Sequence, residues 1–130
     1  MSIKLSSTNV SPYNYYSEGD GSNPISASVT LDGTGGTVDT NVVTTYLVAT
    51  TFNYTGITVQ PVTEETGINW QVSLDGGTTW AESVSPADMD ATAGDQTVAV
   101  SIKAVVANDG TVSTGTYVAA DVQITATENP

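Results

Sequence analysis

Apolar and polar residues alternate along several short stretches of this chain, with the period of two that is typical of a strand with one buried face. The alternation is clearest over residues 25–31, 68–74, 97–107 and 117–126. We expect the apolar positions of these stretches to point inward: Ile25, Ala27, Val29, Leu31; Ile68, Trp70, Val72, Leu74; Val98, Val100, Ile102, Ala104, Val106; and Val118, Ala120, Val122, Ile124, Ala126. These stretches predict β-sheets with one face in a core and one in solvent.

Three further stretches predict strands less cleanly, at residues 2–8, 42–52 and 54–60. Residues 42–52 carry apolar side chains on both faces: Val43, Leu47 and Ala49 on one, and Val42, Tyr46, Val48 and Phe52 on the other. Only one of these faces can meet the core. The other is either covered by residues 13–24 or free to dock on a partner, because periodicity does not separate the two cases.

Turn residues separate these stretches, as in Asp32-Gly33, Asp75-Gly76-Gly77 and Asn108-Asp109-Gly110, and no long window has helical spacing. About seven short strands with glycine-rich turns predict an all-β fold, an immunoglobulin-like two-sheet β-sandwich, with a jelly roll as the alternative. We expect one domain, with residues 1–24 as an N-terminal arm or first strand and residues 25–130 as the sandwich. Its core is predicted between the two sheets, from Trp70, Val72, Val100, Ile102, Val122 and Ile124.

Composition narrows the possible functions. The 130 residues include no cysteine and no histidine, so disulfides, thiolate sites and histidine-based catalysis are excluded. Fourteen acidic residues against two basic ones give a formal charge of -12, which disfavours binding to nucleic acids and anionic membranes. We expect no enzymatic activity, no catalytic residues and no cofactor.

The segment Ser73-Leu74-Asp75-Gly76-Gly77-Thr78-Thr79-Trp80 resembles the Asp-box, the S-x-D-x-G-x-T-W hairpin of sialidase propellers. In that family the motif is structural rather than catalytic. Here Asp75 is expected to accept backbone N–H groups across the turn, and Trp80 to pack over the hairpin. A single copy cannot build a propeller, so the motif predicts a structural hairpin, with glycan contact through Trp80 as the alternative.

A broader resemblance covers the second half of the chain. Ile68-Asn69-Trp70 begins a tryptophan-containing stretch, Thr97-Val98-Ala99-Val100 follows it, and a final stretch runs from Gly115 to Ala126. This order resembles bacterial and phage immunoglobulin-like modules, including BACON-type domains. The resemblance implies a fold only, with Tyr117 as a buried corner tyrosine.

Two acidic loops contain oxygen ligands of the type that Ca²⁺ prefers. One holds Asp88, Asp90 and Asp95, and the other holds Glu18, Asp20 and Asn23. Neither loop has the spacing of an EF-hand, so we interpret both as solvated loops and expect no metal site.

The start of the chain shows neither a basic segment followed by an apolar run nor a membrane-spanning stretch, so no secretory signal is expected. A surface-type module without an export signal fits a virion protein, made in the host cytoplasm. We therefore expect a bacteriophage capsid decoration (cement) protein that binds the major capsid protein or another virion protein, with a possible homo-oligomer. The alternative is an adhesin-like, glycan-binding module of a tail, fibre or cell surface. Partner contacts are expected at Ile3, Leu5, Tyr13, Tyr15, Tyr16, Tyr46, Val48 and Phe52.

Overall fold

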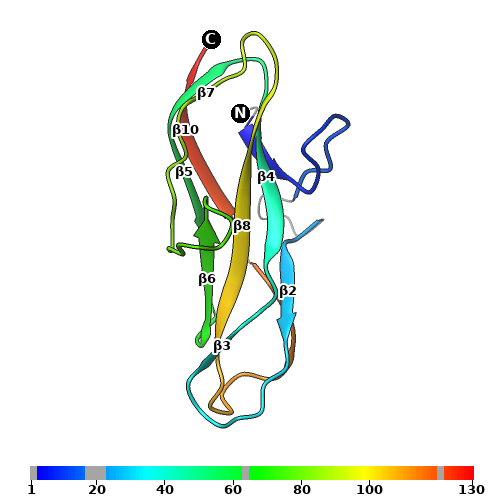
Figure 1. Ribbon diagram of the computed structural model, residues 1–130, viewed down its shortest axis with the longest axis vertical. Helices are drawn as coiled ribbons and strands as arrows, with labels where there is room; N and C mark the ends of the chain where they lie inside the picture. Colours follow the sequence, from blue (N-terminus) through cyan, green and yellow to red (C-terminus); the bar gives the residue numbers. More distant parts are fainter. Residues whose placement is uncertain (1–2, 17–22, 63–64, 120–121) are drawn as a thin grey trace.

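The computed structural model describes residues 3–16, 23–62, 65–119 and 122–130. These residues form ten strands and no helix (Figure 1). The strands are β1 (Ile3–Ser6), β2 (Ser26–Val29), β3 (Thr37–Asp39), β4 (Val43–Ala49), β5 (Asn53–Pro61), β6 (Ile68–Ser73), β7 (Met89–Asp90), β8 (Gln96–Ala107), β9 (Gly115–Val118) and β10 (Val122–Asn129). No helix able to cross a membrane is found in this part of the chain.

One sheet is organised around β8, its longest strand. The first seven residues of β8 pair antiparallel with β4, and its last three pair with β3. Strand β6 pairs with residues 101–106 of β8, overlapping both of these stretches, so β6 must lie on the opposite edge from β3 and β4. Strand β1 pairs with the other side of β4, which gives the order β1-β4-β8-β6 across the sheet.

The second layer contains the three-stranded sheet β10-β5-β7 and the pair β2-β9, all antiparallel. Strand β5 follows β4 along the chain, and β9 and β10 follow β8. The order β1-β4-β8-β6 in one sheet, with β5 beside β10 in the other, is the A-B-E-D and C-F order of an immunoglobulin-like sandwich. The predicted all-β, two-sheet sandwich is therefore confirmed, rather than the jelly roll.

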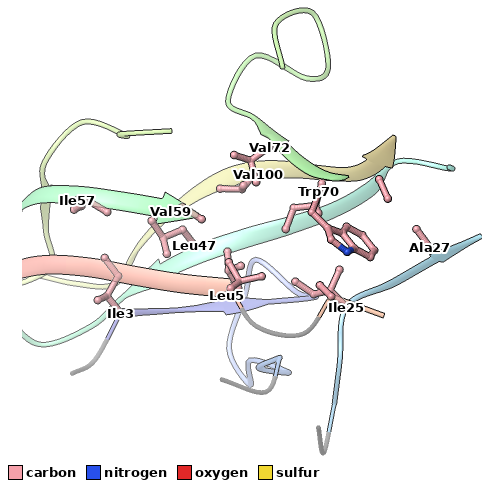
Figure 2. Packing of buried hydrophobic residues seen from close by; sticks show 14 of the residues in the cluster. Ile3, Leu5, Ile25, Ala27, Leu47, Ile57, Val59, Trp70, Val72 and Val100 are labelled. Atoms are coloured by element: carbon pink, nitrogen blue, oxygen red, sulfur yellow. The ribbon is translucent and has the colours of Figure 1, made fainter. Parts of the chain in front are cut away.

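The core lies between these layers and is one contiguous cluster. Figure 2 shows Leu5, Leu47 and Val59 meeting in the interior, and the Trp70 indole lying over Ile25. The prediction of a buried Trp70, Val72, Val100, Ile102 and Val122 is confirmed, whereas Ile124 is only partly buried. Ile124 lies in β10, at the edge of its sheet, where no second neighbouring strand among the described residues completes its cover.

Two predicted inward positions are wrong. Leu74 is exposed, because β6 ends at Ser73 and the chain turns into the Asp75 loop. The stretch 117–126 is not one strand with one inward set: β9 ends at Val118 and β10 begins at Val122. In β9 the buried side chain is Tyr117, while Val118 is exposed, so the alternation is shifted relative to β10. Ala120 lies outside the described residues.

Tyr117 forms a tyrosine corner at the start of β9. Its side chain is buried, and its hydroxyl donates a hydrogen bond to the carbonyl of Ser113, four residues earlier. A corner tyrosine at the start of strand F of immunoglobulin-like sandwiches makes a bond of this kind. The position expected for Tyr117 from the sequence is thus confirmed in its geometry.

The turn between β4 and β5 explains why Phe52 leaves the face predicted for it. Thr51 has a φ of 74°, and the N–H of Phe52 donates to the carbonyl of Thr50 at 2.8 Å. This is a γ-turn, a strained conformation for a residue other than glycine. The turn directs Phe52 against the core cluster rather than onto the outer face of the sheet.

The buried position of Trp70 gives a stability prediction. Trp70→Ala should lower the free energy of unfolding by about 3–5 kcal/mol, because it removes a large side chain from a packed core. Leu74→Ala, at an exposed position just after the end of β6, is the control and should change stability by less than about 0.5 kcal/mol. Urea denaturation followed by far-UV circular dichroism measures both, and a loss below about 1 kcal/mol for Trp70→Ala would contradict this packing.

Candidate functional site: an aromatic face built on the first sheet

The outer face of the first sheet carries a row of side chains fixed by strand register. Lys4 of β1 lies opposite Val48 of β4, and Val48 lies opposite Thr97 of β8. Directly opposed residues in antiparallel strands point to the same side. Since Ile3 and Leu5 point into the core, Lys4, Val48 and Thr97 point away from it.

Residues 7–16, the N-terminal hairpin, fold back along the free edge of β1. The N–H of Ser7 donates to the carbonyl of Asn14, and the N–H of Tyr16 donates to the carbonyl of Leu5, both at 2.9 Å. Ser6 and Tyr15 form an antiparallel bridge. The hairpin projects from the sandwich in Figure 1, and Val10 in its loop has 67% of its surface exposed.

A hydrogen bond then ties this hairpin to the far side of β4. The hydroxyl of Tyr13 donates to Oδ2 of Asp95 at 2.9 Å. Asp95 immediately precedes β8, and β4 lies between β1 and β8, so Tyr13 must reach across the outer side of β4. This explains why Val48, although it points away from the core, is only 1% exposed.

The aromatic rings of the hairpin form a compact group with one cation. The ring centroids of Tyr13 and Tyr15 lie 5.7 Å apart, and Nζ of Lys4 lies 5.6 Å from the centre of the Tyr15 ring. At this distance the ammonium group is attracted to the ring face. We call the surface formed by Lys4, Tyr13, Tyr15, Tyr46 and Val48 the aromatic face.

The tyrosines of this segment remain protonated at neutral pH. The hydrogen bond to Asp95 is the main cause that raises the pKa of Tyr13, followed by burial and the negative charge of Asp95. Burial, followed by the charge of Asp95, raises the pKa of Tyr15, and burial raises that of Tyr16. Their hydroxyls are therefore neutral at pH 7, and each can both donate and accept a hydrogen bond.

The structure divides the predicted partner-contact residues into two groups. Ile3 and Leu5 are buried core residues, and Tyr16 and Phe52 pack against that core. These side chains serve the fold, and the first two have almost no surface to offer a partner. Tyr13, Tyr15, Tyr46 and Val48 lie on one face, of which Tyr15 is the most exposed member, whereas Val48 is covered and offers no more surface than Ile3. Contact of these four with a partner stays a prediction.

Lys4 and Asp95 belong to this face but were not predicted as part of it. Lys4 could have been found from its parity, since it alternates with Ile3 and Leu5 in a strand. No sequence signal joins Asp95 to Tyr13, because 82 residues separate them and only the antiparallel order of β1, β4 and β8 brings them together.

The segment from Ser73 to Trp80 forms the structural hairpin expected of an Asp-box. Oδ1 of Asp75 accepts the N–H groups of Thr78 and Thr79 at 3.0 and 2.8 Å, and the hydroxyl of Ser73 at 2.6 Å. These hydrogen bonds, led by that from Ser73, lower the pKa of Asp75 to about 2. The carboxylate is therefore part of the turn.

Trp80 closes this hairpin instead of offering a flat platform. Its indole N–H donates to the carbonyl of Gly77 at 3.0 Å, and Nζ of Lys103 lies 4.5 Å from the ring centre. Lys103 is in turn paired with Asp39 at 2.7 Å. With a lysine over its ring, Trp80 is poorly placed to stack on a sugar. This weakens the alternative that the motif contacts a glycan through Trp80.

The acidic residues of the loop before β8 bind different hydrogen-bond partners. Asp90 accepts the N–H and hydroxyl of Thr92, and Asp95 accepts the hydroxyl of Tyr13. Among residues 3–16, 23–62, 65–119 and 122–130, no three acidic side chains converge as metal ligands would. Glu18 and Asp20 lie outside the described residues.

Comparison with known proteins gives no relative from which a role could be transferred. No protein-family model matches the chain, and neither the curated sequences nor the solved structures contain a match. The fold and the aromatic face are therefore the basis for any functional assignment.

The lowered pKa of Asp75 makes the stability of this hairpin depend on pH. The pKa of Asp75 is 3.8 in its ordinary state and about 2 in the folded protein. The ionised carboxylate therefore stabilises the folded state fully above about pH 4, and this stabilisation is lost as the pH falls through 2. Asp75→Ala should lower the thermal midpoint at pH 7, and the difference from the wild type should shrink toward pH 2.

Asp88→Ala is the control for loss of an exposed carboxylate, because Asp88 makes no hydrogen bond within the described part of the chain. In the same melts this variant should leave the thermal midpoint at pH 7 unchanged. A difference between wild type and Asp75→Ala that stays constant from pH 7 to pH 2 would show that the carboxylate does not act through this linkage.

Proposed function

We propose that this protein is a non-enzymatic structural protein of a virion, a capsid decoration protein that binds the outer surface of a bacteriophage major capsid protein. The aromatic face carries this proposal. On this face the exposed Tyr15 and the projecting N-terminal hairpin lie against the first sheet. Tyrosine side chains provide large contact areas at low entropic cost, which suits them to protein interfaces.

Charge supports docking through this face. The chain has a net charge of -12, but the aromatic face contains Lys4, one of its two cations, which balances the one carboxylate beside it, Asp95, whose Oδ2 accepts the Tyr13 hydroxyl. A partner docking here would meet little repulsion, whereas the acidic loops elsewhere would disfavour other orientations. The contact should depend on apolar and aromatic surface.

The way in which the hairpin is attached also favours a docking role. Its ends are hydrogen-bonded to β1, and Tyr13 fixes it across β4 to the start of β8. A hairpin held in this way loses little conformational entropy when it binds. Binding to assembled shells, and not to free capsid subunits, would stabilise the shell by mass action.

The alternative is a glycan-binding module of a tail, fibre or cell surface. It has one observation in its favour, a hollow of about 450 Å³ between β5, β6 and β10. Polar side chains suited to sugar hydroxyls line it, namely Gln60, Asn69, Glu82 and Gln123. Trp70 also borders this hollow, but it is buried and has almost no ring surface for stacking.

Docking is tested by sedimenting the protein with shells assembled from the major capsid protein of the same virus. The double variant Val10→Ser with Tyr15→Ser removes two exposed apolar side chains of the hairpin and should bind at least about tenfold more weakly. Point changes are preferable to deletion of residues 1–12, because Ile3 and Leu5 belong to the core. Wild-type binding should persist at high salt, where exposed charge pairs are screened.

The matched control is Leu74→Ser with Val118→Ser, which removes two similarly exposed apolar side chains, 37% and 50% exposed, away from the aromatic face. The control should bind as the wild type does. Equal loss in both double variants, or binding that disappears at high salt, would reject the aromatic face as the docking surface. Binding to a glycan array that Gln60→Ala with Glu82→Ala abolishes, without binding to shells, would favour the alternative.

A further inference from the structure

Most strand edges of the sandwich are occupied by other parts of the chain. Residues 14–16 lie along the edge of β1, Ala81 bridges to Val72 on the edge of β6, and Val84 bridges to Val59 beside β7 on the edge of β5. Strand β2 is linked to Asn41 on the side away from β9. Such covering is how proteins prevent exposed edges from pairing with other chains.

Strand β10 differs from these edges. It pairs with β5 on one side, and within the described residues no backbone hydrogen bond reaches its other side. In an immunoglobulin-like sandwich this is the side of strand F on which strand G lies. Here β2 occupies only the neighbouring stretch beside β9 and does not extend along β10.

The first six residues of β10 carry none of the usual protective residues, and the one charged residue of the strand, Glu128, lies near its end. Residues 122–127 contain no charge, no lysine and no proline, although these are the usual protective residues. The register shift near Thr125 places the extra residue on β5, where Gly56 has a φ of 60°, so β10 keeps a regular pleat. The strand therefore offers eight residues in a form able to pair.

The core is also incomplete along this strand. Ile124 and Ala126 point inward but are only partly buried, whereas their neighbours Ile57 and Val59 on β5 are fully buried. A strand added to the open edge would cover the remaining apolar surface of these two side chains. Burial of apolar area, together with backbone hydrogen bonds, would then favour the addition.

We propose that this edge pairs antiparallel with β10 of a second copy of the chain, which joins the two three-stranded sheets across a two-fold axis. Charge favours a second copy, because two chains of charge -12 can approach only through an uncharged surface, and residues 122–127 provide one. The order of residues in β10 also favours antiparallel pairing with a second copy. Pairing centred on Thr125 places Gln123 opposite Thr127 and Ile124 opposite Ala126, with no carboxylate facing another carboxylate.

Because Thr125 faces its own copy across the axis, a charge swap tests the pairing. Thr125→Lys and Thr125→Glu should each weaken self-association, since each places like charges directly opposite one another. Mixed in equal amounts, the two variants should form a heterodimer favoured roughly tenfold over the homodimers. Sedimentation velocity over a concentration series measures the association, and native mass spectrometry distinguishes the heterodimer.

Thr58→Lys is the control, because Thr58 is the register partner of Thr125 on β5 and lies one strand further from the axis. It should leave self-association unchanged. The wild type should also show concentration-dependent protection from hydrogen exchange at alternate amides of residues 122–128. A wild type that stays monomeric over the whole series, or a dimer unaffected by the charge swap, would overturn the proposal. The test needs no capsid, so it is independent of the proposed docking function.

Discussion

The register between β4 and β8 is the constraint on which the rest of this structure depends. It places Leu47 opposite Val98 and Val43 opposite Ile102, so that one set of side chains fills the core. The same register turns Tyr46, Val48 and Thr97 outward. A slip of the register by one residue would bury the aromatic face and expose Leu47. The burial of the inward side chains therefore also fixes the positions of the outward ones.

The candidate site is held by the same arrangement. Strand β1 is secured by Ile3 and Leu5 in the core, and this anchoring places Lys4 on the outer face and starts the N-terminal hairpin at a fixed point. Tyr13 then reaches Asp95 because β4 brings β1 and β8 to the right separation. Core packing, hairpin position and the surface offered to a partner are thus consequences of one sheet. The open edge of β10 lies in the other layer, so the two proposed contacts use separate surfaces.

The fold was predictable where one face of a strand is apolar and the other polar. Trp70 and Val72 alternate with Asn69 and Gln71, and this stretch lies in the sheet as predicted. Prediction failed where backbone geometry interrupts the alternation. The γ-turn at Thr51 turns Phe52 toward the core, and the break between β9 and β10 exchanges the inward positions of Tyr117 and Val118. Neither interruption is marked by a glycine or a proline at the position where it occurs.

The site was only partly predictable for a different reason. The sequence pattern does not separate Ile3 and Leu5 from partner contacts, because an apolar side chain in a short strand looks the same whether it meets a core or another protein. Tyr13 and Tyr15 lie on one face with Tyr46, but the position of the hairpin that carries them depends on a hydrogen bond between residues 13 and 95 that no local pattern contains. Long-range pairing, rather than composition, decides which of these side chains reach the surface.

Hydrogen–deuterium exchange of the free and the shell-bound protein tests the central claim that the aromatic face is the docking surface. The account predicts that binding increases protection in residues 7–16 and in the adjoining residues 95–97, with little change in the hairpin from Ser73 to Trp80. Protection that appears in that hairpin or around the hollow between β5 and β6, with residues 7–16 unchanged, would contradict it.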